Sequence, residues 1–221
     1  MASLTTVTAF TAAFTVGFDL DMTLIDSRPG IGAVWRALSS ETGVPIDADA
    51  ATSRLGPPLA DELARWFPPD LLEVRADRFR ALYPGLAIEP TPAFAGAHDS
   101  LSAVRRLGGR AVVITGKFEP NALLHMTHLG LQVDRVLGWC WGEGKTAALE
   151  SEGAAIYVGD HLEDMRAATA AGVIGVGVRT GGADPEELRA AGANVVLDEL
   201  TQFPAWLTTA LSELVGLDAA G

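Results

Sequence analysis

Cysteine is almost absent from this chain of 221 residues. Cys140 is the only one. A single cysteine excludes an intramolecular disulfide framework and a zinc site built from several thiolates. Free thiols persist in reducing compartments, so we expect a cytoplasmic protein.

Positive charge is also scarce. The chain has 16 lysines and arginines against 28 aspartates and glutamates, which gives a formal net charge of -12. Such a field repels polyanions, so we expect neither nucleic acid nor an acidic membrane surface as a partner. A small anion can still bind where local cations override the overall charge.

Long apolar runs are missing as well. Residues 1–13 are too polar for a membrane span and lack the three-part form of a signal peptide, so we expect an extended lead-in to the first strand. Hydrophobic residues nevertheless make up 48% of the chain and charged residues 20%. This balance predicts a globular protein, and the length suits one large domain or a core with a smaller insert.

Short apolar runs rich in valine and isoleucine recur along the chain. They lack a clean polar alternation, which is typical of strands covered on both faces, and they occupy residues 14–18, 110–115, 154–159, 173–178 and 193–197. Helical patterns lie between them at 96–107, 121–130, 163–172 and 185–192. The alternation predicts an α/β fold with a Rossmann-like parallel sheet.

Residues 28–94 have a different pattern. They are helical in period, contain no strand-like run, and are flanked by "SRPG" and "EPTPAFAG". We therefore expect a helical cap domain inserted after the first strand, with residues 1–27 and 95–221 forming the catalytic core. An insert at this place overhangs the carboxyl end of the first strand, where ligands bind in open α/β sheets.

Candidate site residues follow three of these runs and one further expected strand, "RVLGWCW" at residues 135–141, and are predicted to share one crevice. They are Asp19 and Asp21, then Thr115 and Gly116, then Lys145, and last Asp160 and Asp164. Each has a structural explanation alone: a turn, a helix cap, a solvated lysine, or an acidic capping box of Asp160 with Glu163. Their joint occurrence in this order favours a functional site.

These residues carry a resemblance to a known family. "DLDMT", "ITGK", Lys145 and "GDHLED" resemble the four motifs of the haloacid dehalogenase superfamily. The helical insert and "RLGPPL" at residues 54–59 resemble the cap of its phosphoglycolate-phosphatase-like members. Two features depart from the pattern. Met22 stands where glycine is usual, and only fifteen residues separate Lys145 from Asp160, with Thr146 in place of a usual proline.

The resemblance implies a division of labour between the two first aspartates. Asp19 would attack phosphorus and form an aspartyl-phosphate intermediate, while Asp21 would act as general acid and then as general base. Close carboxylates push their proton affinities apart, which supports one ionised and one protonated partner.

The resemblance also implies a metal and a phosphate site. Mg²⁺ would be held by the Asp19 carboxylate, the Asp21 backbone carbonyl and Asp160, and Asp164 would lie in the outer shell or anchor Lys145. Thr115, the Gly116 N–H and Lys145 would bind phosphoryl oxygens. Crowded carboxylates and a phosphate dianion repel one another by about 4 kcal/mol per pair at 4 Å, so a cation is needed.

We therefore expect a Mg²⁺-dependent phosphatase that acts on a small phosphorylated metabolite, with phosphoglycolate as the leading candidate by analogy. The alternatives are a phosphosugar mutase of the same fold and a non-catalytic regulatory domain. The protein is expected to be a monomer or a small homo-oligomer.

Five further residues carry weaker signals. His125 and His128 are three residues apart on an expected helix, and we expect solvated or half-buried side chains rather than zinc ligands. Trp139 and Trp141 are expected to pack on a strand. Arg54 is either a surface arginine or a contact for a substrate carboxylate.

Overall fold

The computed structural model describes residues 14–218, with side chains up to residue 212. The expected lead-in at residues 1–13 lies outside this range. Six parallel strands form one sheet in the order β3-β2-β1-β4-β5-β6. They are β1 Thr15–Phe18, β2 Arg110–Ile114, β3 Arg135–Leu137, β4 Ala154–Gly159, β5 Ile174–Val178 and β6 Val195–Leu197. The predicted α/β fold class is confirmed.

Helices cover both faces of the sheet, as strands without polar alternation require. One face packs on α5 (Ala97–Arg106), α6 (Glu119–Leu129) and α10 (Phe203–Asp218), next to the 3₁₀ helix η2 (Leu200–Gln202). The other packs on α7 (Glu143–Ser151) and α8 (Leu162–Ala170), with α9 (Pro185–Ala190) near β5 and β6. Side chains therefore alternate between two apolar layers, with Val113 in one and Val112 in the other.

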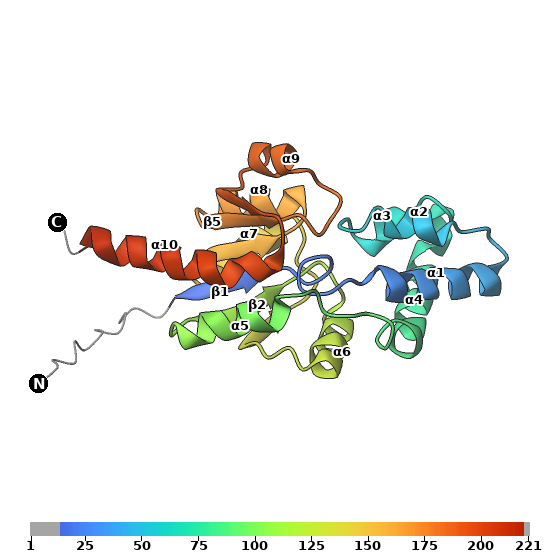
Figure 1. Cartoon of the computed structure of the whole chain (residues 1–221). Helices are drawn as coiled ribbons and strands as arrows, with labels where there is room; N and C mark the ends of the chain where they lie inside the picture. The colour runs from blue at the N-terminus through green and yellow to red at the C-terminus, as the bar shows by residue number, and fades with distance from the viewer. Residues whose placement is uncertain (1–13, 219–221) are drawn as a thin grey trace, which may run out of the picture.

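The segment after β1 forms a separate helical body at one side of the sheet (Figure 1). It contains α1 (Arg28–Thr42), α2 (Ala48–Thr52), α3 (Leu59–Leu63), the 3₁₀ helix η1 (Pro69–Leu71) and α4 (Leu72–Leu86). Trp35, Leu38, Leu63 and Phe79 belong to its own buried apolar cluster. We call residues 28–94 the helical insert.

The chain enters and leaves the helical insert side by side. Ile25 and Ala93 form an antiparallel bridge. The N–H of Asp26 donates to the carbonyl of Pro92 at 3.0 Å, and the N–H of Phe94 donates to that of Leu24 at 2.9 Å. The two crossings are thus hydrogen-bonded to each other.

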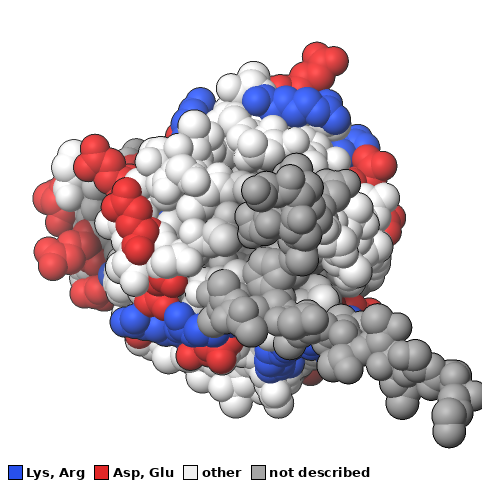
Figure 2. Space-filling model, turned by 90° about the vertical axis from the view of Figure 1, so that its left-hand side faces the viewer, with Lys and Arg blue, Asp and Glu red and all other residues white. Residues whose placement is uncertain are grey.

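The surface agrees with the acidic composition. On the face turned toward the viewer in Figure 2, acidic side chains gather along one edge, while basic side chains are scattered among the described residues. None of the helices in the described range is long and apolar enough to cross a membrane.

Candidate active site

The two motif-one aspartates lie directly beyond the end of β1, at the centre of the sheet. Asp19 is buried, and its N–H donates to the carbonyl of Val158 in β4 at 2.8 Å. The strand order reverses here, because β1 pairs with both β2 and β4. Such a switch point leaves a crevice at the carboxyl ends of the strands. The structure therefore places Asp19 and Asp21 where an open α/β sheet binds ligands.

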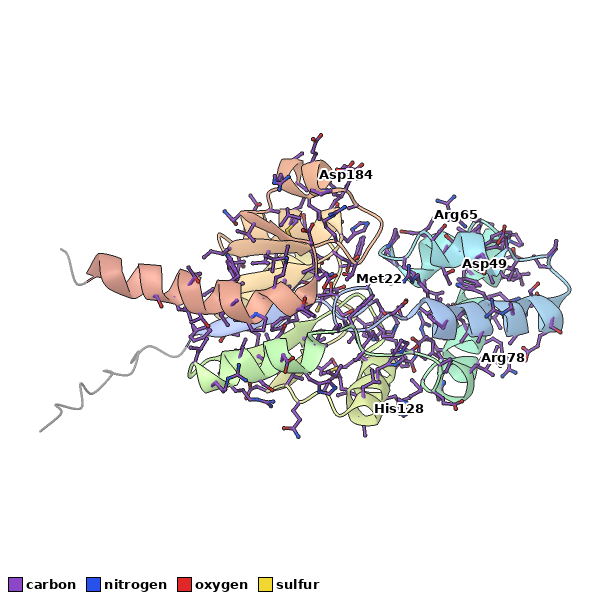
Figure 3. All side chains as sticks on the ribbon, in the orientation of Figure 1. Met22, Asp49, Arg65, Arg78, His128 and Asp184 are labelled. Carbon is purple, nitrogen blue, oxygen red and sulfur yellow. The ribbon has the colours of Figure 1, made fainter. Side chains whose placement is uncertain are left out.

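Met22 continues the turn in a left-handed conformation, with φ of 63°. This region favours glycine, and a residue with a side chain adopts it at a cost of roughly 1–2 kcal/mol. The Met22 N–H donates to the Ile25 carbonyl at 2.8 Å, and the Thr180 hydroxyl donates to the Met22 carbonyl. The side chain is buried at the junction of sheet and helical insert (Figure 3). These contacts hold the turn with methionine, rather than glycine, in the left-handed position.

Lys145 lies in the first turn of α7 and is only 2% exposed. Its Nζ donates to Asp19 Oδ1 at 3.0 Å and to Asp164 Oδ1 at 2.5 Å. The short spacing to Asp160 is accommodated because α7 has only 9 residues, and Gly153, with φ of 59°, leads directly into β4 at Ala154. The structure thus brings Lys145 into contact with the nucleophile candidate.

Asp164 is fully buried and engaged by donors. Besides Lys145, it accepts hydrogen bonds from the Tyr157 hydroxyl at 3.2 Å and from the His161 N–H at 3.0 Å. A carboxylate with three donors is held in one orientation. Asp164 therefore fixes Lys145 beside Asp19.

Asp160 accepts a hydrogen bond from the Thr23 hydroxyl at 2.8 Å, which ties the fourth motif to the first. The alternative explanation of Asp160 as a capping box with Glu163 is wrong. His161 is the N-cap of α8 and Asp164 is its partner, because the Asp160 side chain turns toward Thr23 instead. Asp160 is thus available to the crevice.

Three carboxylates form a group that suits a cation. One oxygen from each of Asp19, Asp160 and Asp164 lies within 4.8 Å of the others. Burial raises the pKa of Asp19 to about 7 against the pull of Lys145, with Asp164 and Asp21 adding to the rise. Burial, with the nearby charges of Asp164 and Asp19, raises the pKa of Asp160 well above its usual range. A divalent cation would relieve this crowding, and oxygen donors of this kind suit a hard cation.

The second motif lies beside the first, at the end of β2. Thr115 is buried, and its hydroxyl accepts a hydrogen bond from the N–H of Lys117 at 3.3 Å. Gly116 lines the same cavity as Asp19 and Asp160. The predicted residues Thr115, Gly116 and Lys145 are therefore brought together with the aspartates.

Lys117 is a site residue that the sequence analysis did not assign. Its Nζ donates to both carboxylate oxygens of Asp21, at 2.7 Å and 2.8 Å. Burial would raise the pKa of Asp21, but the Lys117 charge and its hydrogen bonds outweigh burial and lower it. The available signal was the position of Lys117 inside "ITGK", next to the Gly116 already singled out.

Tyr83 from α4 connects the helical insert to this pair. The Lys117 Nζ lies 4.8 Å from the centre of the Tyr83 ring, and the Tyr83 hydroxyl is hydrogen-bonded to His125 Nε2 at 2.9 Å. His125 is fully buried, so the expectation of a solvated or half-buried side chain is wrong for it. His128 is exposed on the outer side of α6, as expected (Figure 3).

Trp139 and Trp141 do not pack on a strand, and that expectation is wrong. β3 ends at Leu137, because Gly138 lies against Glu119 and its N–H donates to the Glu119 carboxylate at 3.1 Å. Trp139 then adopts a left-handed φ of 59° and is 57% exposed. The chain leaves the sheet here and carries both rings toward the crevice.

A cavity of about 560 Å³ lies between the sheet end and the helical insert. The core contributes the aspartates, Lys145 and His161, and the insert contributes the turn between α2 and α3, which includes Arg54. The Arg54 guanidinium donates twice to Glu62, at 3.1 Å and 2.6 Å. Arg54 therefore lines the cavity but is already paired.

Comparison with known proteins agrees with this geometry. The model of the haloacid dehalogenase-like hydrolase family matches residues 16–169. Phosphoglycolate phosphatase from Caulobacter vibrioides is 29% identical over 219 residues, covering 90% of this chain and 92% of that protein. A haloacid dehalogenase-like family hydrolase from Streptococcus pneumoniae has the same fold, with a TM-score of 0.78 at 22% identity, covering 88% of this chain and 98% of the other.

A shorter match links the chain to a different enzyme. The tyrosine-protein kinase PtkA from Mycobacterium tuberculosis is 33% identical over 116 residues. The match covers 52% of this chain and 40% of the kinase.

The chain belongs to the haloacid dehalogenase-like hydrolase family, because the family model matches residues 16–169 and the motifs agree with it.

Proposed function

We propose that this phosphatase is Mg²⁺-dependent and hydrolyses a small phosphomonoester through an aspartyl-phosphate on Asp19. The observation that carries the proposal is the buried contact of Asp19 with Lys145 at 3.0 Å, beside Asp160 and Asp164. Lys145 leaves one Asp19 oxygen without a donor among the described residues, and that oxygen can attack phosphorus. The leading substrate, by analogy with the full-length relatives, is phosphoglycolate.

Mg²⁺ would be held by Asp19, the Asp21 backbone carbonyl and Asp160, and when bound it would neutralise charge on the phosphoryl group. Thr115, the Gly116 N–H and Lys145 would donate to the phosphoryl oxygens as negative charge spreads over them. Asp164 would keep Lys145 aimed at Asp19 rather than touch substrate.

Asp21 would donate a proton to the leaving alkoxide and then remove one from water. In the structure Lys117 occupies both oxygens of Asp21 and holds it ionised. Donation therefore requires Lys117 to move away, and a phosphoryl oxygen is a suitable new acceptor for its ammonium. Residues 28–94 would form the cap domain that closes over the organic part of the substrate.

Release of inorganic phosphate from a panel of phosphomonoesters tests the proposal. Asp19→Asn should abolish release, because an amide is not a nucleophile. Asp99→Asn, at an exposed aspartate on α5, is the matched control and should keep normal rates. A substrate rearranged without phosphate release would instead indicate a mutase. Near-normal release by Asp19→Asn, with deamidation excluded, would contradict the nucleophile assignment.

A further inference from the structure

The cavity is larger and more aromatic than a two-carbon substrate requires. Its volume of about 560 Å³ falls within the roughly 300–1,000 Å³ of pockets that bind whole organic ligands. Aromatic rings line it from both sides, with Trp35, Phe79 and Tyr83 from the helical insert and Phe118, Trp139 and Trp141 from the core. The leaving group of phosphoglycolate would contact few of these rings.

The cations of the cavity are already paired. Among the described residues, every arginine and lysine that lines it contacts a carboxylate. Arg54 and Arg65 contact Glu62, Arg80 contacts Asp77, Lys117 contacts Asp21, and Lys145 contacts Asp19 and Asp164. Asp61 adds a further acid to the lining. A second anionic group on the substrate would meet acids and no unpaired cation.

Trp139 is the aromatic residue of the cavity best placed to contact a ligand. It is 57% exposed although its backbone is held in the left-handed region, a strain that clusters at ligand clamps. Its N–H donates to the Lys117 carbonyl at 2.9 Å. The Phe118 ring lies edge-on to the Trp139 ring, with 5.2 Å between the ring centres. The Arg80 guanidinium carbon lies 4.7 Å from the centre of the Trp139 ring. A large apolar surface is thus fixed beside the phosphate-binding loop.

We propose that the alcohol part of the substrate carries an uncharged ring, which binds against Trp139 and Phe118 under the helical insert. This inference rests on the proposed phosphatase function, and for the substrate of that site it replaces phosphoglycolate, the candidate by analogy, with a ring-bearing phosphomonoester. The ring gains apolar burial and edge-to-face contacts, whereas a carboxylate there would compete with Asp77 for Arg80.

A matched pair of substrates tests the subsite. 2-Phenylethyl phosphate and ethyl phosphate both release a simple primary alcohol, so the ratio of their kcat/KM values reports binding of the ring. Burial of a phenyl ring predicts a ratio of about ten to a hundred in favour of 2-phenylethyl phosphate. 2-Phosphoglycolate should be no better than ethyl phosphate. Trp139→Ala should lower the ratio about tenfold, while Leu123→Ala, at an exposed apolar residue outside the cavity, should leave it unchanged.

The outcomes separate this inference from the proposed function. A ratio near one, or 2-phosphoglycolate as the better substrate, overturns the ring subsite and leaves the phosphatase intact. If no phosphomonoester is hydrolysed, the proposed function fails, and the subsite is then judged by calorimetric binding of 2-phenylethylphosphonate and ethylphosphonate. Tighter binding of the phenyl compound supports the subsite, and equal or absent binding overturns it.

Discussion

The buried His125 should make the stability of this protein depend on pH. Burial, reinforced by the nearby Lys117 charge, lowers the pKa of His125 from 6.5 to about 4. The unfolded chain therefore binds a proton on this residue at a pH where the folded chain does not. The stabilising contribution is fully present above pH 6.5 and is lost as the pH falls toward 4.

The size of the effect follows from the two pKa values. At pH 5 the histidine is almost fully protonated in the unfolded chain and almost fully neutral in the folded one. Proton linkage then predicts a loss of about 2 kcal/mol of unfolding free energy between pH 7 and pH 5 from this residue alone. That is a large part of the roughly 5–15 kcal/mol that stabilises a typical domain.

Urea unfolding at the two pH values measures this contribution. Other groups also titrate, so the relevant quantity is the pH-dependent loss in the wild type minus the loss in His125→Gln. His128→Gln is the matched control, because His128 is exposed on the same helix. We expect wild type and His128→Gln to lose about 2 kcal/mol more than His125→Gln. An equal loss in all three proteins would refute the reasoning, and His125→Asn repeats the comparison if the glutamine variant unfolds.

Three further outcomes are expected. Excess chelator should abolish phosphate release and Mg²⁺ should restore it, with Ca²⁺ a poor substitute because it is larger and less strictly octahedral; full turnover in chelator would contradict a metal site at Asp19 and Asp160. Gly56→Ala should lower the melting temperature and kcat/KM, because Gly56 has φ of 135° and a Cβ there would lie 2.7 Å from the His161 ring. The control Gly85→Ala adds a methyl group in open space and should leave the melting temperature unchanged or raise it. Arg54→Ala should lower kcat/KM by less than about threefold for both phosphoglycolate and p-nitrophenyl phosphate, since Arg54 is paired with Glu62; a tenfold loss for phosphoglycolate alone would instead indicate a carboxylate contact.

The fold and the central residues of the site could be predicted because their signals are local. Five of the six strands in the described range fall within the apolar runs rich in valine and isoleucine, and parallel strands bring residues that follow them to one edge of the sheet. Asp19, Thr115 and Asp160 all follow strands that are neighbours in the observed order. The position of each residue directly after a parallel strand was sufficient to predict their meeting, without knowledge of the strand order.

The contacts across the crevice could not be predicted in the same way. Tyr83 and His125 are 42 residues apart and on different bodies, and nothing in either local sequence indicates their hydrogen bond. Trp139 was misread because "RVLGWCW" alternates like a strand, whereas the close approach of Gly138 to Glu119 ends the strand early. Tertiary packing determines where these side chains lie, and the local sequence pattern does not indicate it.

Because of the bridge between Ile25 and Ala93, the fold of the sheet depends little on the length or sequence of the segment inserted between them. Opposite residues of an antiparallel pair lie about 4.5–5.5 Å apart, so the helical insert begins and ends at almost the same point of the core. A loop whose ends already meet adds little closure entropy with length, about 0.6 kcal/mol for each doubling. The segment between the two crossings can thus be lengthened, shortened or replaced while the strands that position Asp19 and Asp160 keep their register. Substrate range in such a chain can change at one insertion point, separately from the chemistry.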